Sequence, residues 1–308
     1  MRYSGIGGQA VMEGVMMKNG SRYAVAVRKP NQEIVIESSE YAGIGKNRKI
    51  RNMPIVRGVL NFIESLSLGF RTLSYSASFF EEEEEKAEKR EKKKEDAVMG
   101  ATMAASVVLA VGIFMALPYG LSLLFREAIS SQWLLALLEG VIRLLIFLGY
   151  VAVISLMPDI RRVYMYHGAE HKCINCIESG MDLTVENVRK SSRLHKRCGT
   201  SFLLIVMLVS ILFFLFIRVD SGILRLLLRL LLIPVIAGVS YEFIRLAGRS
   251  DHVLVNLLSK PGLLLQKITT REPEDDMIAV GIASVEAVFD WKSYVREIRR
   301  EHTEGKAS

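Results

Sequence analysis

The stretch YHGAEHKCINCIESG gathers two histidines, a glutamate and two cysteines in a short segment. On a helix, His167 and His171 are four residues apart and face the same way, and Glu170 lies beside them. In this H-x-x-E-H spacing, neutral imidazoles hold zinc while the carboxylate activates a water molecule. We therefore predict that His167 and His171 bind a divalent metal, with zinc as the first choice, and that Glu170 is the catalytic general base.

A catalytic zinc needs a third protein ligand and an open coordination position. A second polar cluster, LHKRCG, offers His195 and Cys198 as ligands or as groups that orient them. Glu242 in GVSYEFIRLAG is a further candidate ligand, because an ionisable residue inside an apolar segment usually faces a polar site or a partner. The alternative for Glu242 is an ion pair with Arg245 or with an arginine of a loop.

Two other interpretations of these residues stay open. The pairs Cys173-x-x-Cys176 and His195-x-x-Cys198 have the spacings of a closed structural zinc site with three cysteines and one histidine. Such a site would join the two halves of the segment without catalysing a reaction. In the other interpretation no metal binds, the histidines form hydrogen bonds within the loop, and the cysteines are small buried apolar residues.

The elements that position these residues follow from the distribution of apolar residues. Half of the 308 residues are hydrophobic and 24% are charged, so the two kinds must be segregated along the chain. Four apolar segments are each near the roughly 20 residues that a membrane-spanning helix needs; they are 97–125, 133–157, 202–217 and 223–247. We expect a mainly α-helical, polytopic membrane protein with about four transmembrane helices in a lipid bilayer. The third segment is short and Pro234 interrupts the fourth, and buried helices of a soluble protein are the alternative.

Basic residues orient this bundle. Lysine and arginine are dense before the first segment, between the second and third, and after the fourth, whereas only Arg126 lies between the first two. By the positive-inside rule, both termini and the His/Cys segment are cytoplasmic in a multi-pass inner-membrane protein. Arg225 and Arg229 weaken this count, but their long side chains can reach the membrane surface. The same placement accounts for the net charge of +7 without a nucleic-acid partner.

The cysteines and the first residues of the chain indicate in which cellular compartment the polar segments lie. All three cysteines fall in one short polar segment, and an odd number argues against the disulfide framework of a secreted protein. Glu13 and Lys18 interrupt the apolar stretch near the start of the chain, so we expect no signal peptide. Reduced thiols on a cytosolic face are the simpler expectation.

The N-terminal residues predict a small β element. The runs AVAV and EIVIE between Arg22 and Ser39, separated by a Pro-Asn turn, are typical of a β-hairpin. The glycine-rich stretch GIGGQAVMEG lacks the spacing of a nucleotide-binding loop, and we expect a tight turn that brings Glu13 or Gln9 near the His/Cys segment.

Other segments complete the expected division of the chain. Helical spacing of apolar residues from Ile55 to Phe80 predicts an amphipathic or membrane-associated helix, and the run of Glu and Lys after it predicts a solvated linker. A last amphipathic helix closes the chain. The predicted parts are an N-terminal β-containing cytoplasmic element at 1–54, the helix at 55–80, the charged linker at 81–96, a first transmembrane pair at 97–157, the cytoplasmic His/Cys loop at 158–200, a second transmembrane pair at 201–247 and a cytoplasmic C-terminal region at 248–308.

Six motifs in this order resemble a known family: GGQAVMEGVMMK, MPIVRGV, YHGAEHKCIN, LHKRCGTSFL, SYEFIRL and LQKITTREP. Together they look like the bacterial YqhQ-like membrane proteins, a family catalogued as a domain of unknown function and described as predicted metal-dependent enzymes. The resemblance covers nearly the whole chain. It implies a site centred on His167, Glu170 and His171, with His195 and Cys198 as ligands or neighbouring groups. In similar proteins other residue types often stand at positions 173 and 176, which disfavours the structural zinc site with three cysteines.

Two functional hypotheses of different classes follow. The first is a metal-dependent hydrolase at the cytoplasmic face of the membrane, acting on a peptide or a lipid-linked molecule. The second is a non-catalytic membrane scaffold or assembly factor in which the histidines and cysteines only stabilise the loop. A transporter is less favoured, because Glu139 and Arg143 lie within the second apolar segment but no inverted repeat accompanies them. Four helices are few to enclose a pathway, so a homo-oligomer is compatible with either hypothesis.

Overall fold

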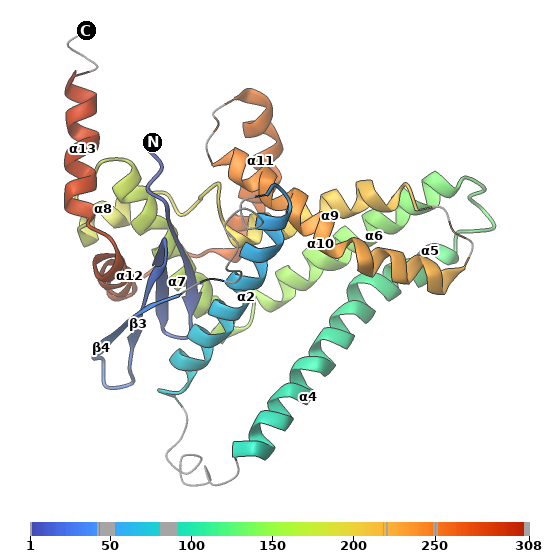
Figure 1. The fold of residues 1–308 in the computed structure, drawn as a ribbon, viewed down its shortest axis with the longest axis horizontal. Coiled ribbons are helices and arrows are strands. Elements are labelled where there is room, and N and C mark those ends of the chain that lie inside the picture. Colours follow the sequence, from blue (N-terminus) through green and yellow to red (C-terminus); the bar gives the residue numbers. More distant parts are fainter. Residues whose placement is uncertain are drawn as a thin grey trace.

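The computed structural model describes residues 2–41, 43, 53–80, 92–217, 219, 221–248, 250 and 252–304. A small sheet with several covering helices forms one end of the molecule, and long helices extend away from it (Figure 1). The prediction of a charged linker helix falls for the most part on residues 81–91, which lie outside the described residues.

The N-terminal element is a four-stranded antiparallel sheet in the order β1-β2-β3-β4. Its strands are β1 (Ile6–Val11), β2 (Gly14–Asn19), β3 (Arg22–Arg28) and β4 (Ile34–Glu40). The predicted hairpin is the β3–β4 pair, and the prediction of a hairpin alone is corrected to a sheet twice that size. The first two strands lack the alternating pattern, because β1 contains adjacent glycines and β2 is apolar on both faces.

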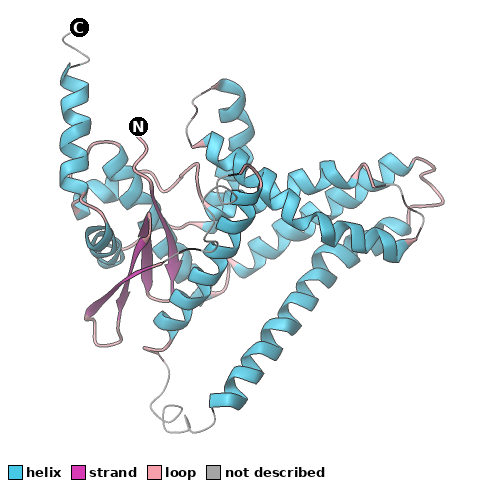
Figure 2. Ribbon diagram, viewed as in Figure 1, coloured by secondary structure: helices cyan, strands magenta, loops and turns pink. Residues whose placement is uncertain are grey.

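Helices cover both faces of the sheet, which explains why the central strands read as continuous apolar runs. On one face, strand residues such as Val15 and Met17 pack with α7 (Pro158–Glu178) and α12 (Asp275–Val288). On the other face, Val25 and its neighbours pack with Leu68 of α2 (Val56–Ala77). Figure 2 shows the strands between these helices. α7 is therefore held in place by its packing against one face of the sheet.

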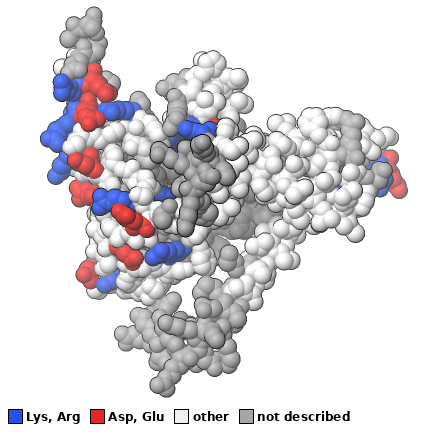
Figure 3. Space-filling model, in the orientation of Figure 1, with Lys and Arg blue, Asp and Glu red and all other residues white. Residues whose placement is uncertain are grey.

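The long helices form the second part of the fold. They are α4 (Lys92–Val111), the π-helical turn η2 (Gly112–Ala116), α5 (Leu117–Leu123), α6 (Gln132–Ile154), α9 (Gly199–Phe214), α10 (Gly222–Ala247) and α11 (Val253–Thr269). α8 (Val185–Lys190) follows α7, and α13 (Trp291–Glu304) ends the described chain. α10 continues through Pro234, which had suggested a break. Charged side chains gather over the sheet end and at the far tip, and the surface of the bundle between them is uncharged in Figure 3.

Three helical segments among the described residues are long and apolar enough to cross a membrane: Gly100–Leu123, Gln132–Ile154 and Gly222–Ala247. They are consistent with a membrane protein. The third predicted span is α9, an apolar helix of only 16 residues. At 1.5 Å per residue it extends about 24 Å, which is short of the roughly 30 Å hydrocarbon core of a bilayer.

The helix predicted from Asp159 to Ser179 is present as α7, one residue earlier at each end. Pro158 occupies its first turn, where a missing N–H costs nothing, and Asp159 follows. Gly180 ends it with a φ of 75°, which a glycine adopts without strain. α7 is mostly buried from Tyr166 onward, so its polar residues lie inside the protein and need partners there.

Candidate metal centre

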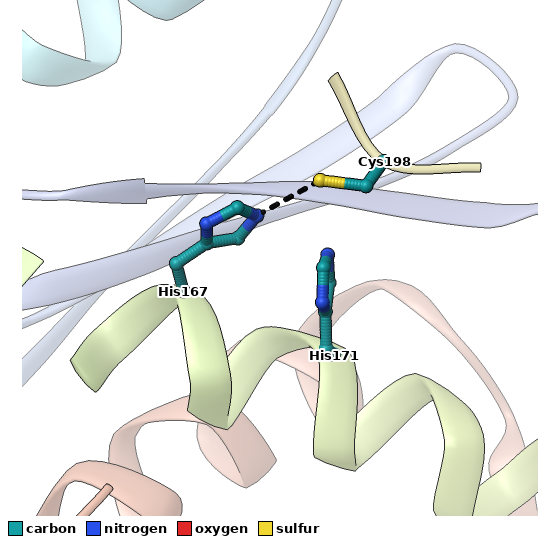
Figure 4. A group of neighbouring side chains, drawn as sticks. All are labelled: His167, His171 and Cys198. Atoms are coloured by element: carbon teal, nitrogen blue, oxygen red, sulfur yellow. Dashed lines mark hydrogen bonds between the residues drawn. The ribbon is translucent and has the colours of Figure 1, made fainter. Parts of the chain in front are cut away.

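His167 and His171 face the same way, as their spacing predicted, and Cys198 lies close to both. One potential ligand atom from each lies within 4.8 Å of the others. The histidines project from consecutive turns of α7, and Cys198 approaches from the segment that leads into α9 (Figure 4). Ligand atoms of a tetrahedral zinc with one sulfur lie roughly 3.3–3.7 Å apart. Small side-chain movements would therefore bring the three atoms to that geometry.

Backbone carbonyls behind the two histidines fix their tautomers. Nδ1 of His167 lies 2.9 Å from the carbonyl oxygen of Thr269, and Nδ1 of His171 lies 2.6 Å from that of Arg193. A carbonyl only accepts, so each Nδ1 carries the proton and donates it. In the neutral imidazoles both Nε2 lone pairs are then free for a metal, the arrangement usual for zinc-binding histidines.

The segment after α11 reaches His167 because Gly168 allows a close approach. A Cβ at residue 168 would lie 2.0 Å from the carbonyl oxygen of Arg271. The amide of Arg271 also donates to the carbonyl of Tyr164, which fixes the segment beside α7. Thr269 in the motif LQKITTREP thus has a role at the site that the sequence did not reveal, since a backbone carbonyl leaves no signal in the residue type.

Two further polar residues of α7 hold the loop that carries Cys198. The buried ammonium of Lys172 donates to the carbonyls of Arg189 and Ser191, and the amide of Asn175 donates to those of Ser192 and Leu194. From α11, Gln266 donates to the carbonyl of His195 and accepts from its amide. The motifs EHKCIN and LQKITT thus fix the loop conformation, a role that we did not predict.

Cys198 has the electrostatic surroundings of a thiolate. It is the N-cap of α9, where its sulfur accepts from the amide of Thr200, and its Sγ lies 3.2 Å from Nε2 of His167. Burial acts to raise the pKa of Cys198, but the two histidines outweigh burial and hold it well below its ordinary value. Burial likewise acts to lower the pKa of His167, but the thiolate raises it to about 9. Without a metal, both pKa shifts favour a protonated His167 beside a deprotonated Cys198.

Glu170 lies between the two imidazoles. Its Oε2 is 3.8 Å from Nε2 of His167 and 3.8 Å from Nε2 of His171, and the residue is 4% exposed. Strand β1 passes so close that a Cβ at Gly8 would lie 2.7 Å from Cγ of Glu170. The glycine-rich motif GIGGQAVMEG therefore makes room for this carboxylate, which brings the predicted base next to the predicted ligands.

Glu13 lies near α7 as the sequence predicted. It occupies the β1–β2 turn with a φ of 48°, and its carboxylate accepts two hydrogen bonds from Arg162 and one from Tyr166. The Arg162 guanidinium lowers the pKa of Glu13. Gln9 instead faces α2, where a Cβ at Gly69 would meet its side chain. The turn therefore ties the sheet to the start of α7.

A cavity of about 270 Å³ opens beside the cluster. Its lining combines His167, Glu170, His171 and Cys198 with the N-terminal segment and the end of α10. Two arginines, Arg197 and Arg245, and two tyrosines, Tyr3 and Tyr241, also line it. The cavity therefore lies against the two histidines, Glu170 and Cys198, and two arginines lie on its wall.

His195 lies near the cluster but faces other partners. Its ring centre is 5.6 Å from that of His171, yet its Nε2 lies 3.0 Å from Arg197 Nη2 and 3.8 Å from Glu178 Oε2. Burial lowers the pKa of His195. The structure thus groups Cys198 with the two histidines and leaves His195 as a neighbour that lines the cavity.

The lowered pKa of Glu178 leads us to expect that the fold is less stable in acid. Burial acts to raise its pKa, but His195, Arg197 and Ser4 outweigh burial and lower it to about 2 from the ordinary 4.5. A carboxyl with a depressed folded pKa stabilises the protein above its unfolded pKa, and this contribution is lost as the pH falls from about 4.5 towards 2. Unfolding by denaturant across this range should show a loss of about 3 kcal/mol at most in the wild type. Glu178→Gln should remove this part of the pH dependence, and an unchanged profile would contradict the assignment.

Glu242 forms an ion pair rather than contacting the cluster. Its carboxylate accepts two hydrogen bonds from the guanidinium of Arg57 on α2, and Arg245 lies 3.9 Å from it. The predicted role of Glu242 as a metal ligand is therefore corrected to its ion-pair alternative. The partner is Arg57 because α2 crosses α10 closely, where a Cβ at Gly238 would lie 2.7 Å from the carbonyl oxygen of Ile55.

This pairing gives a prediction for Glu242→Gln. The variant should bind metal like the wild type but unfold at a lower temperature, because Arg57 loses its carboxylate partner. Metal content and thermal unfolding of the purified variant check both parts. Arg57→Gln should cost a similar amount, and the double variant should cost clearly less than the two losses together. Loss of metal from Glu242→Gln in a folded protein would restore Glu242 as a ligand.

Cys173 and Cys176 do not join Cys198. Cys173 is fully buried against α12, where a Cβ at Gly281 would lie 3.0 Å from its sulfur. The thiol of Cys176 donates to the carbonyl of Asp182 at 3.5 Å. Burial raises the pKa of both thiols, so they stay protonated. Among the described residues, the geometry of a structural site with three cysteines is not formed.

Comparisons with known proteins agree with the family resemblance. The family model described as "Protein of unknown function (DUF1385)" matches residues 53–291. The chain is 36% identical over 289 residues to "Uncharacterized protein YqhQ" of Bacillus subtilis (strain 168), which covers 90% of each chain. No solved structure matches. This match over most of the chain shows that the protein belongs to the YqhQ-like family of proteins of unknown function.

Proposed function

We propose that the protein is a zinc-dependent hydrolase whose metal is held by His167, His171 and Cys198. One observation carries this proposal: each histidine donates its Nδ1–H to a backbone carbonyl, which directs both Nε2 atoms to the space beside Cys198. Two imidazoles that serve only as packing groups have no need of this shared orientation. Zinc-binding histidines require it, since the outer hydrogen bond fixes the tautomer and raises the basicity of the ligand.

The donor set fits zinc better than harder divalent ions. Two imidazole nitrogens and one thiolate are a borderline to soft set, whereas magnesium and calcium prefer oxygen ligands. Three protein ligands also leave the fourth tetrahedral position open, which is the pattern of catalytic rather than structural zinc. The neighbouring cavity of about 270 Å³ supplies the space for a substrate at that position.

In this proposal Glu170 moves the proton. A zinc ion at the cluster would supply Lewis acidity and lower the pKa of water at its open position. Oε2 of Glu170, 3.8 Å from both Nε2 atoms, would accept the proton of the attacking water and return it to the leaving group. Arg197 and Arg245 on the cavity wall would orient an anionic or carbonyl-bearing substrate. A peptide or a lipid-linked molecule fits these requirements.

The location of the site completes the proposal. Three apolar helices support a multi-pass protein of the inner membrane, and α9 would be a fourth, shorter span within the bundle. The positive-inside rule favours a cytoplasmic position for both termini and for the metal centre. α11, with exposed apolar residues such as Val253, Leu254 and Leu257, would rest on the membrane surface beside the cavity.

Cobalt substitution tests the metal centre without knowledge of the substrate. The purified protein, stripped with a chelator and titrated with Co²⁺, should develop thiolate-to-cobalt absorption in the near ultraviolet and visible bands of tetrahedral cobalt. Cys198→Ser should lose the charge-transfer absorption, whereas Cys176→Ser should keep it. If a folded protein binds no cobalt, the second hypothesis of a non-catalytic scaffold with a metal-free loop takes its place.

A further inference from the structure

A second cavity, of about 90 Å³, is lined by residues of α5, α6, α9, α10 and the segments that join them. The ends of these helices meet far from the sheet (Figure 1). The lining includes three arginines, Arg126, Arg225 and Arg229, but among the described residues only one carboxylate, that of Glu139. This cavity is therefore positively charged within an apolar bundle, and nothing in the proposed metal centre uses it.

Glu139 is shared between two buried guanidinium groups. Arg229 donates to both of its carboxylate oxygens, at 2.5 and 2.7 Å, and Arg143 donates to one of them at 2.7 Å. The side chains of all three residues are 4–5% exposed. Arg225 has no carboxylate partner among the described residues and donates to the carbonyl of Val219. Among the described residues, one carboxylate thus faces three guanidinium groups.

The arginines also have unused donors. The Nε atoms of Arg143, Arg225 and Arg229 are buried, and no partner for them exists among the described residues. Arg229 is only 4% exposed and is one of the residues that line the cavity. Buried cations that outnumber their counter-charges are costly, and ionisable residues in a membrane bundle usually mark a binding site. An anion in the cavity would balance the excess positive charge and could accept hydrogen bonds from these arginines.

The surroundings indicate which anion fits. Tyr119 and Trp133 line the cavity, and Tyr119 lies under the guanidinium groups of Arg225 and Arg229 at 5.3 and 5.7 Å. Tyrosine and tryptophan are enriched at the level of lipid headgroups. Ile223 is 77% exposed at the same end of α10, as an apolar residue facing lipid would be. Guanidinium groups match the oxygens of a phosphate with their forked donors.

We propose that this cavity binds a phosphate-bearing anion between Arg225 and Arg229, at the end of the bundle opposite the metal centre. The phosphate can come from the headgroup of an anionic lipid or from solution. This binding requires no metal, so an experiment on it can fail without affecting the proposed hydrolase, and the reverse also holds.

Native mass spectrometry of the full-length protein in detergent tests the lipid source, and thermal unfolding with added inorganic phosphate tests the soluble source. We expect the wild type to retain phosphatidylglycerol over phosphatidylcholine or to be stabilised by phosphate. In Arg225→Gln the apparent affinity for the bound form should fall at least about tenfold. Arg225→Lys, which keeps the charge but not the forked donors, should bind more tightly than Arg225→Gln and less tightly than the wild type.

The matched control is Arg161→Gln, an exposed arginine in the first turn of α7 outside both cavities. It should bind like the wild type, which separates a built site from general attraction of anionic lipid. Failure of the wild type to bind either phosphatidylglycerol or phosphate would overturn the proposal. Equal binding by wild type and a folded Arg225→Gln variant would also overturn it.

Discussion

Glu170→Gln should keep zinc and lose hydrolysis. Glutamine has the shape of glutamate, so it fits the space that Gly8 leaves for the side chain and does not disturb the nearby histidines. It cannot accept a proton, and removal of a general base costs roughly 10²–10⁴ in rate. Turnover of a panel of peptide and lipid-linked esters by the purified protein measures the loss, and elemental analysis of the same sample measures the zinc.

The control for this variant is Glu186→Gln. Glu186 is an exposed carboxylate of α8 that pairs with Lys190 and lies outside the cavity, so its loss should leave both turnover and zinc unchanged. A Glu170→Gln protein that hydrolyses substrate like the wild type would remove Glu170 as the base. One that loses zinc as well would make Glu170 a ligand rather than a base.

His171→Ala should lose most of its metal. The imidazole supplies one of three protein ligands, and loss of even an outer hydrogen-bond partner costs 10- to 100-fold in metal affinity, so loss of the ligand should cost roughly 100-fold or more. Competition with a chromophoric chelator measures the affinity. The variant also leaves the carbonyl of Arg193 without its donor, and a lower unfolding temperature should accompany the metal loss.

His252→Ala is the control that separates the loss of metal from the loss of stability. His252 is an exposed histidine that caps α11 and has no contact with the cluster, so this variant should bind zinc with wild-type affinity. A folded His171→Ala protein with wild-type zinc affinity would show that His171 is not a ligand. The same result for Cys198→Ser would show that Cys198 is not a ligand.

Patterns of apolar residues predicted much of the fold. Helix α7 and three long apolar helices lie where periodicity and Pro158 indicated them, within a few residues. The first two strands were missed because β2 is buried on both faces and so lacks alternation. α9 is as short as predicted but begins three residues before the predicted start at 202, because Cys198 caps it and the chain before Gly199 is fixed by hydrogen bonds from α7 and α11.

The site was predictable where side chains on one helix carry it. The i,i+4 spacing brought His167 and His171 to one face, and Glu170 followed from the same geometry. The choice of Cys198 over His195 could not be predicted, because both lie in one short loop whose path depends on Lys172, outside that loop. The role of Thr269 and Arg193 also escaped prediction, because their carbonyls act independently of residue type.

The measurement that tests the central claim most directly is the zinc content of the purified wild-type protein. Elemental analysis should find close to one zinc per chain, tightly held at neutral pH and released on acidification as the ligands take up protons. The His171→Ala protein, prepared in parallel, should contain little. A wild-type protein that is fully folded and free of metal, and that takes up none when zinc is supplied, would contradict the account.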